Sequence, residues 1–491
     1  MMHFTRLFAP VAMTLCASAA LAQDSITVAI QLEPPNLDPT GGAAQAIDSV
    51  LYANVFEGLT RFAADGAIIP ALAESWAVSD DGLVYLFQLH DGVTFHDGTT
   101  MDAEDVKFSL DRARAEDSTN AQKALFAGIT EVLVVDPLTV QITLDQPNGN
   151  FPFNLAWGDA VIVAPESIAD IATNPIGTGP FAFADWVQGD RIELTRNDSY
   201  WGTPAMLETA TFRFISDPTA AFAAMMAEDV DAFVGFPAPE NIPQFEADPR
   251  FQVLIGNTEG ETILAMNNAQ PPFDNKLVRE AVSLAIDRQA IIDGAMFGQG
   301  TPIGTHFAPH NPDYVDLLAN SPHDPARAEE LLAEAGFPDG FSTTLKLPPP
   351  SYARRGGEII ASQLRAVGID AQITNLEWAQ WIEEVFTNKD FGLSIVSHTE
   401  PMDIGIYANP DYYFQYDNPE FQEVMEQLNA TTAPIARSAL LQKAQTIISE
   451  DYVNGYLFEL AIATVAKAGL QGLWVNQPTA AVDLTQVSWA E

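Results

Sequence analysis

The chain has 491 residues, with 22 Lys and Arg against 66 Asp and Glu, and a formal net charge of −44. This acidic excess excludes a nucleic-acid binder, which needs clustered positive charge facing phosphates. It is typical of a solvated surface that keeps an exported protein soluble and monomeric, and it does not by itself indicate a cationic ligand. Hydrophobic residues make up 47% of the chain, which predicts a globular protein of two or three domains.

The first 22 residues read as a secretory signal peptide. Arg6 supplies a short positive region, residues 7–20 are apolar, and Ala20-Leu21-Ala22 has the small residues of a cleavage site. Cleavage after Ala22 would place the mature protein in the periplasm. No later apolar run reaches the roughly 20 residues that a bilayer requires, so the mature chain is predicted to have no membrane span.

The single cysteine, Cys16, lies inside this segment. A lipid anchor at Cys16 is disfavoured because Leu15 stands where a lipoprotein signal needs Gly, Ala or Ser. After cleavage the mature chain has no cysteine, which excludes disulfides, zinc–cysteine sites and thiol nucleophiles.

The first half of the mature chain is dominated by strand and turn patterns. Two Asp-Gly turns, at His90-Asp91-Gly92 and His96-Asp97-Gly98, follow a strand near residues 84–89 and give a hairpin-like signature with Val93 and Phe95. A helix capped by Thr100 or Asp102 comes next, with acids in its first turn. We also expect a helix over 48–58 and strands at 25–30, 132–135, 140–144, 181–183 and 192–195.

The second half is richer in helices, which makes the chain mixed α/β. Helices are predicted over 275–292, from the Asp324-Pro325 cap to a C-cap at Gly336, over 353–367 and 377–386, and from Pro434 onward. The tyrosine-rich segment 407–416 is predicted to be a cleft loop and not a core element.

Several separated blocks carry a family resemblance. They are residues 85–109, Asn54-Val-Phe-Glu-Gly-Leu-Thr-Arg, Pro70-Ala-Leu-Ala-Glu-Ser-Trp, Ile176-Gly-Thr-Gly-Pro-Phe, Asn197 to Trp201, Pro272-Phe-Asp-Asn, Ala285-Ile-Asp-Arg and Ala328 to Gly340. In this order they resemble the extracellular solute-binding proteins of family 5, the dipeptide, oligopeptide and nickel type that serves ABC importers. The blocks cover nearly the whole mature chain.

The resemblance implies an α/β, periplasmic-binding-protein-like fold with two lobes around a ligand cleft and a smaller domain appended to the N-terminal lobe. It implies a monomer without cofactor or catalysis, whose partners are a small solute, an ABC permease and its ATPase subunits. The expected organisation is a signal peptide at 1–22, lobe one at 23–58, 175–258 and 460–491, the appended domain at 59–174, and lobe two at 259–459.

A short peptide is the ligand that the resemblance favours. Arg354 and Arg355 match a motif in which an arginine takes the peptide carboxylate in a two-pronged hydrogen bond. Glu400 or Asp403 would pair with the ligand ammonium, because the family's usual Trp-Gly-Asp or Asp-x-Pro-Asp segment is here Ser397-His-Thr-Glu-Pro-Met-Asp.

The remaining expected ligand contacts come from aromatic and polar side chains. Trp378 and Trp381 share a helix face, although core packing is the commoner use of at least one of them. Asn36 lies in a loop that touches ligand backbone in the family, Tyr412 belongs to the tyrosine-rich segment, and His398 lies beside Glu400.

Other functions remain open. The ligand could be a chelated metal, an opine or a saccharide, although no pair of histidines has metal-site spacing on a helix; His306 and His310 are separated by a proline, and His90 and His96 are expected to be structural. An exported hydrolase is disfavoured because no Gly-x-Ser-x-Gly, His-Glu-x-x-His or Ser-x-x-Lys motif occurs. A chemoreceptor ligand module would share the fold.

Overall fold

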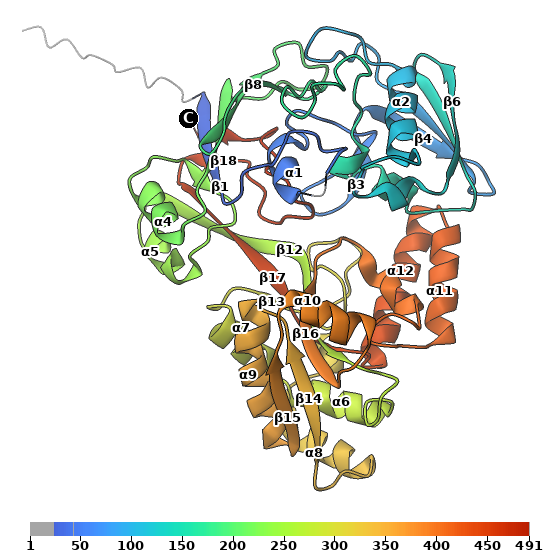
Figure 1. Cartoon of the computed structure of the whole chain (residues 1–491), viewed down its shortest axis with the longest axis vertical. Coiled ribbons are helices and arrows are strands. Elements are labelled where there is room, and N and C mark those ends of the chain that lie inside the picture. Colours follow the sequence, from blue (N-terminus) through green and yellow to red (C-terminus); the bar gives the residue numbers. More distant parts are fainter. Residues whose placement is uncertain (1–23, 43, 491) are drawn as a thin grey trace, which may run out of the picture.

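The computed structural model describes residues 24–42 and 44–490 (Figure 1). The predicted signal peptide and its cleavage site lie outside these residues. The centre of the molecule is an 11-stranded sheet. Its spatial order is β15 (Ile369–Asn375), β14 (Phe341–Leu347), β16 (Leu393–His398), β12 (Phe251–Met266), β17 (Gly455–Lys467), β11 (Ala232–Phe233), β1 (Ser25–Ile30), β10 (Thr209–Phe214), β9 (Arg191–Arg196) and β8 (Phe181–Val187), with β13 (Thr301–Pro302) beside β17.

The long antiparallel strands β12 and β17, called here the hinge strands, connect the two halves of the molecule (Figure 1). We call the half that contains β11, β1, β10, β9 and β8 lobe one, and the half that contains β15, β14 and β16 lobe two. The pairing of the hinge strands is regular up to Asn257, opposite Ala461, and resumes at Glu261, opposite Glu459. The irregular stretch between these pairs lies at the junction of the lobes.

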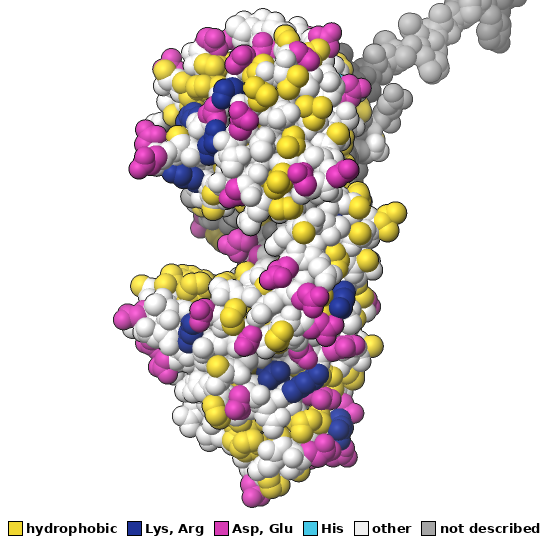
Figure 2. Space-filling model, turned by 90° about the vertical axis from the view of Figure 1, so that its right-hand side faces the viewer, with side chains coloured by type: hydrophobic (Ala, Val, Ile, Leu, Met, Phe, Trp, Pro, Cys, Tyr) yellow, Lys and Arg dark blue, Asp and Glu magenta, His cyan; other side chains and the backbone are white. Residues whose placement is uncertain are grey.

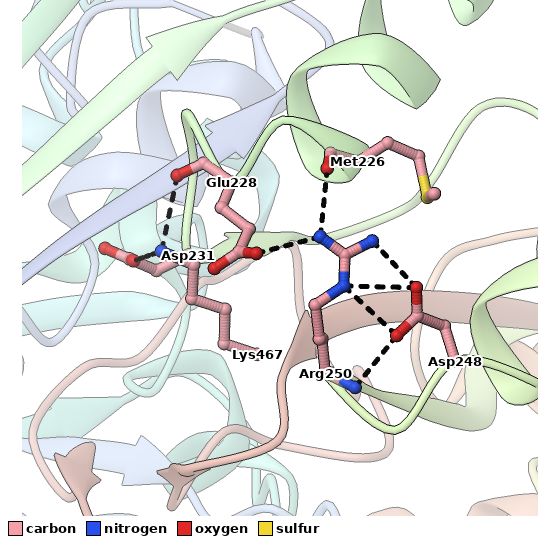
Figure 3. A network of polar contacts seen from close by, with 6 residues as sticks. All are labelled: Met226, Glu228, Asp231, Asp248, Arg250 and Lys467. Atoms are coloured by element: carbon pink, nitrogen blue, oxygen red, sulfur yellow. Dashed lines mark hydrogen bonds and ion pairs between the residues drawn. The ribbon is translucent and has the colours of Figure 1, made fainter.

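A charged network fastens one end of the hinge strands within lobe one (Figure 3). Lys467, the last residue of β17, has its Nζ 2.8 Å from Asp231 Oδ1. Arg250, directly before β12, pairs with Asp248 at 2.7 Å and with Glu228 at 2.8 Å. This end of the two strands is therefore anchored to lobe one.

The helices of lobe one are short. They are α1 (Gln45–Leu51), α4 (Pro218–Met226) and α5 (Ile242–Glu246), with a 3-10 turn, η3 (Pro239–Asn241), and a small sheet of β18 (Leu470–Gln471) and β19 (Ser488–Trp489). The expected helix over 48–58 was wrong in both bounds, because α1 begins at Gln45 and ends at Leu51. It cannot continue to Gly58, because the chain turns at Ala53, whose φ is +60°. Gly58 is not a helix cap; a Cβ there would lie 2.8 Å from the carbonyl oxygen of Leu155.

The appended domain is a second antiparallel sheet packed against one helix. Its elements are β4 (Ala73–Val78), β5 (Val84–Leu89), β7 (Thr139–Leu144), β6 (Ile129–Asp136), α2 (Ala103–Arg114), α3 (Phe151–Asn154), η1 (Lys123–Phe126), η2 (Gly158–Ala160) and the pair β2 (Thr60–Phe62) and β3 (Ile68–Pro70). The predicted cap of α2 is confirmed, since Asp102 and Asp105 form a capping box.

The hairpin-like expectation is confirmed for the second Asp-Gly turn, where Thr94 and Thr100 form an antiparallel bridge and the N–H of Met101 donates to the carbonyl of Val93. It was wrong for the first turn. β5 pairs with β4 and β7, and Val93 and Phe95 are buried in the turn region without forming a strand. His96 has the structural role expected of it, because its Nε2 lies 2.9 Å from Gly179 O and its Nδ1 accepts from the N–H of Gly177.

Lobe two places helices around the rest of the large sheet. They are α6 (Lys276–Ala285), α7 (Arg288–Ala295), α8 (Pro325–Glu334), α9 (Ser351–Ala366), α10 (Trp378–Trp381) with a π-helical turn η5 (Ile382–Thr387), α11 (Pro419–Ala430), α12 (Pro434–Glu450), and the 3-10 turns η4 (Leu318–Asn320) and η6 (Asp403–Ala408). Asp324 caps α8 and Gly336 follows it with φ +94°, as predicted. The single helix expected over 275–292 is divided, because Asp287 caps a new helix.

The tyrosine-rich segment 407–416 is core and not the predicted cleft loop. Tyr407, Tyr413 and Phe414 are almost completely buried and pack with α11 and α12. The polar residues of this segment lie in turns while Tyr407, Tyr413 and Phe414 are buried, so a pattern of aromatics among Asn and Asp does not distinguish a loop from core here.

Lobe two also contacts the appended domain directly. The N–H of Gly149 donates to the carbonyl of Asn429 at 2.8 Å, and Arg437 at the start of α12 donates to Asn150. The halves of the molecule therefore meet at the hinge strands and at this second contact. Among the described residues, no helix is both long and apolar enough to cross a bilayer.

Candidate functional site

A cavity of about 490 Å³ lies where the two lobes and the appended domain meet. Figure 2 shows the surface hollowed between the upper and lower halves. The lining comes from α1 and the loop before it, the turn before η1, the η2 turn, the irregular stretch of the hinge strands, the loop after β16 and a C-terminal segment near Gln477. Because these segments belong to both halves, a bound molecule would contact both.

The upper wall contains two carboxylates. Asp48 lies on α1 and Asp159 in η2, and one carboxylate oxygen of each is buried without a hydrogen-bond partner in the described residues. Burial raises the pKa of Asp159 to about 6. Burial, and then the charge of Asp159, raise the pKa of Asp48 well above its usual range. Gly158 permits this arrangement, since a Cβ there would lie 2.2 Å from Asp48 Oδ1.

The hinge contributes a third carboxylate. Glu259 lies in the irregular stretch of β12, is 7% exposed, and has its Oε1 2.7 Å from Nε2 of the buried His310. Burial raises the pKa of Glu259, and the contact with His310 partly offsets this rise. The adjacent Gly260 has no room for a side chain, because a Cβ would come within 2.9 Å of the Leu460 Cβ. The side chain of Leu460 thus packs directly against the backbone of Gly260.

Two further carboxyls, Glu261 and Glu459, are buried one residue beyond the part of each hinge strand that lines the cavity. They are opposite each other in the pairing of β12 and β17, and His398 of β16 lies opposite Glu261 on the other side. Burial, and then charges of neighbouring acids, raise the pKa of both carboxyls well above the usual range. Each carboxyl therefore keeps its proton to a higher pH than a solvated glutamate does.

His398 and Asp403 of the predicted ligand set lie together, in a buried network with His306. Asp403 Oδ1 is 2.6 Å from His306 Nε2, and Oδ2 is 3.1 Å from His398 Nδ1. Burial opposes ionisation of Asp403, but the two histidines hold its pKa below its usual range. The other ring nitrogens contact the hydroxyls of Tyr407 and Tyr413, each at 3.2 Å.

This network is also the group in the described residues whose donor atoms could hold a metal, since the ligand atoms of His306, His398 and Asp403 lie within 4.8 Å of one another. Every ring nitrogen already has a protein partner. A metal would have to displace these contacts, so the arrangement fits a structural network better than a metal centre.

Glu400 is the member of the predicted set that lines the cavity; the other eight, all within the described ranges, do not. It is exposed in the loop after β16. Asn36 lies near the rim, because its Nδ2 is 3.9 Å from where a Cβ of Gly42 would be, and Gly42 lines the cavity. Its Oδ1 accepts from the N–H of Asp38 and so shapes that loop.

The predicted arginines lie on α9, away from the cavity wall. Arg354 donates to Glu377 at 3.0 Å and to the carbonyl of Leu376 at 3.1 Å. Arg355 is exposed, with its guanidinium 5.4 Å from the centre of the Phe297 ring. Phe297 itself lines a second cavity of about 280 Å³ near the start of α9.

The predicted aromatics divide between core and surface. Trp381 is buried and donates to Ser394 at 2.9 Å, whereas Trp378 is 42% exposed at the start of α10. Tyr412 is half-buried, with its ring 5.5 Å from that of Phe386. In Figure 1, α10 lies at the end of lobe two that faces lobe one.

Sequence reasoning missed Asp48, Asp159 and Glu259. The first two have no distinguishing local pattern among 66 acidic residues. Glu259 offered a weak signal, because Thr258-Glu-Gly-Glu-Thr interrupts an otherwise apolar strand with two acids around a glycine.

Comparison with known proteins identifies the fold and the family. The profile described as "Bacterial extracellular solute-binding proteins, family 5 Middle" matches residues 67–445. The glutathione-binding protein GsiB of Escherichia coli O1:K1 / APEC is 31% identical over 493 residues, covering 96% of this chain and 95% of GsiB.

Two solved structures are similar over nearly their whole length. HbpA2 from Haemophilus parasuis has 25% identity and a TM-score of 0.87, covering 95% of this chain and 100% of HbpA2. A nickel ABC transporter structure from Bacillus halodurans has 26% identity and a TM-score of 0.83, with coverage of 95% and 100%. The two-lobed α/β fold expected from the sequence is thereby confirmed, and the chain belongs to the bacterial extracellular solute-binding proteins of family 5.

Proposed function

We propose that this chain captures a short peptide in the cavity between its lobes and delivers it to an ABC permease after the lobes close. The position of the cavity carries the proposal, because its walls come from both lobes and from the irregular stretch of the hinge strands. A ligand that contacts both walls stabilises the closed form in proportion to those contacts. No covalent step is needed.

The peptide class is supported by two observations. The relative GsiB is named for glutathione, itself a tripeptide, and about 490 Å³ is the volume of a site for a small ligand. We assign the ligand ammonium to Glu400, which lines the cavity, and the ligand carboxylate to Arg355, which is exposed on α9 and would approach the ligand as the lobes close.

We further propose the domain boundaries and export route expected from the sequence. One buried cluster spans residues from Leu59 to Ala164, and two others hold most of lobe two, which supports an appended domain at 59–174 and a second lobe at 259–459. Family membership supports an extracytoplasmic location, and the proposal adds cleavage after Ala22 and a monomeric mature protein.

The experiment is to identify ligand released from the purified protein by mass spectrometry, followed by calorimetric titration with that ligand or with defined tripeptides. Arg355→Ala and Glu400→Ala are each expected to weaken binding by about tenfold, or ~1.4 kcal/mol. Both variants should keep the melting temperature of the unmodified protein. Arg327→Ala is the matched control, because Arg327 lies on α8 at the far end of lobe two (Figure 1).

Two outcomes would overturn parts of this proposal. Unchanged affinity in both variants would remove the two residue assignments. Hydrolysis of the added peptide would show that the chain is an enzyme and not only a binding protein.

A further inference from the structure

The charged side chains in the wall of the cavity between the lobes are all acidic among the described residues. Asp48 and Asp159 lie on the upper wall, Glu259 at the hinge and Glu400 on the side of lobe two. Among the described residues, no Lys, Arg or His lines this cavity. A ligand that fills it therefore meets carboxylates from both sides of the hinge.

The acidic excess of the whole chain would by itself place some acids in any cavity, so the burial of these groups is what distinguishes them. Asp159 and Glu259 are each only 7% exposed, unlike the solvated acids of the outer surface. One oxygen of Asp159 and one of Asp48 lack a hydrogen-bond partner in the described part of the chain. A buried carboxylate without a partner is unfavourable, because it has lost its hydration and gained nothing in exchange.

Among the described residues, one of these buried acids has an imidazole beside it, and the other two have no side-chain partner. Glu259 has His310 at 2.7 Å. Asp48 lies against Gly158, the residue before Asp159, and the charge of Asp159 adds to the cost of ionising Asp48. The raised pKa of each carboxyl reflects this cost, because binding a proton removes the buried charge. A cationic group from a ligand would compensate them better.

We propose that the cavity selects peptides of net positive charge, with the side-chain ammonium or guanidinium of a lysine or arginine placed against Asp48 and Asp159. This inference rests on the proposed function and adds the charge class of the ligand to it. The ligand's amino terminus is bound separately, near Glu400. A ligand with several carboxylates, such as glutathione, would instead bring like charges against the same wall.

The test compares tripeptides that differ in one charge. Ala-Lys-Ala, Ala-Ala-Ala and Ala-Glu-Ala are titrated into the full mature protein by calorimetry at neutral pH, together with glutathione and the polyamine spermidine. Ala-Lys-Ala is expected to bind at least about tenfold more tightly than Ala-Ala-Ala, as for one charge-assisted hydrogen bond. Ala-Glu-Ala and glutathione are expected to bind more weakly than Ala-Ala-Ala.

Variants then localise the effect. Asp159→Asn should reduce the preference for Ala-Lys-Ala over Ala-Ala-Ala by about tenfold, because it removes one of the two charges proposed to face the lysine. Glu131→Gln is the control, since it removes one negative charge at an exposed position on β6 of the appended domain. This control variant should prefer Ala-Lys-Ala over Ala-Ala-Ala to the same extent as the unmodified protein. Melting curves of both variants verify that they are folded.

The outcomes separate this inference from the proposed function. Equal or tighter binding of Ala-Ala-Ala or Ala-Glu-Ala, or a preference unaltered in Asp159→Asn, would overturn the charge selection. Failure of every cationic probe to bind at millimolar concentration would overturn it too. If spermidine binds and no tripeptide does, the charge selection stands and the peptide function is overturned.

Discussion

Glu261 on β12 lies directly opposite Glu459 on β17, and both carboxyls are buried where the hinge strands enter lobe two. One oxygen of Glu261 and both oxygens of Glu459 have no hydrogen-bond partner among the described residues. Two carboxylates cannot both be charged at such a pair without a large cost, so the folded chain retains protons there.

This pair predicts a specific dependence of stability on pH. The pKa of each carboxyl is raised in the folded chain above its usual value of 4.5. Between that value and the folded pKa the folded state binds more protons than the unfolded state, so stability is greatest at low pH and is lost as the pH rises. The double variant Glu261→Gln with Glu459→Gln should therefore show a smaller fall in melting temperature between about pH 5 and about pH 8.

The control for that measurement is Glu131→Gln, an exposed acid on β6, which should retain the pH dependence of the unmodified protein. An equal fall in melting temperature in the double variant and in the control would contradict the buried protons at the hinge.

Ligand affinity should also depend on pH. Because the pKa of Asp159 is about 6 in the free protein, lowering the pH to about 5 protonates most of this carboxyl and removes its attraction for a cation. Ala-Lys-Ala is expected to bind about tenfold more weakly at pH 5 than at neutral pH, by calorimetry. Asp159→Asn should have a smaller pH dependence, and a dependence as large as in the unmodified protein would assign the effect to another group.

The Ile176-Gly-Thr-Gly-Pro-Phe motif needs glycine at Gly177 and Gly179 because neither position has room for a side chain. A Cβ at Gly177 would lie 1.9 Å from the carbonyl oxygen of Val55, and one at Gly179 would lie 2.4 Å from that of Asn54. Gly177→Ala should therefore lower the free energy of unfolding by about 1–3 kcal/mol, the usual cost of overpacking, or more because backbone must move.

Urea denaturation measures this effect, with Gly405→Ala as the control. The nearest atom to a Cβ at Gly405 is Cε of Met425 at 3.7 Å, an ordinary contact. Equal stability of the two variants would show that the backbone around Val55 adjusts freely.

Asp403 is expected to stabilise the fold. Its carboxylate bridges His306 and His398 in a buried site, so Asp403→Ala should lower the free energy of unfolding by about 3 kcal/mol, as for other buried networks that lose a charged partner. Asp411→Ala is the control, because that carboxylate is 93% exposed nearby. Lost peptide affinity with unchanged stability would instead assign Asp403 to the ligand.

The family resemblance, the α/β class and many local features could be predicted from the order of the residues alone. The caps of α2 and α8 were predictable because Asp102 and Asp324 accept hydrogen bonds from N–H groups two and three residues ahead, and the sequence displays such neighbours directly. The break between α6 and α7 was missed because its apolar spacing continues a helical pattern across Asp287.

The acids that line the cavity could be identified only from the folded chain. Asp48, Asp159, Glu259 and Glu400 come together at one cavity although long stretches of chain separate them, and nothing around Asp48 or Asp159 marks them out among the other acids. The same holds for Tyr407 and Tyr413, whose burial depends on α11 and α12 packing over them. Caps and periodicity arise from neighbours in sequence, whereas the walls of a cavity and the burial of its charges arise from contacts between distant segments.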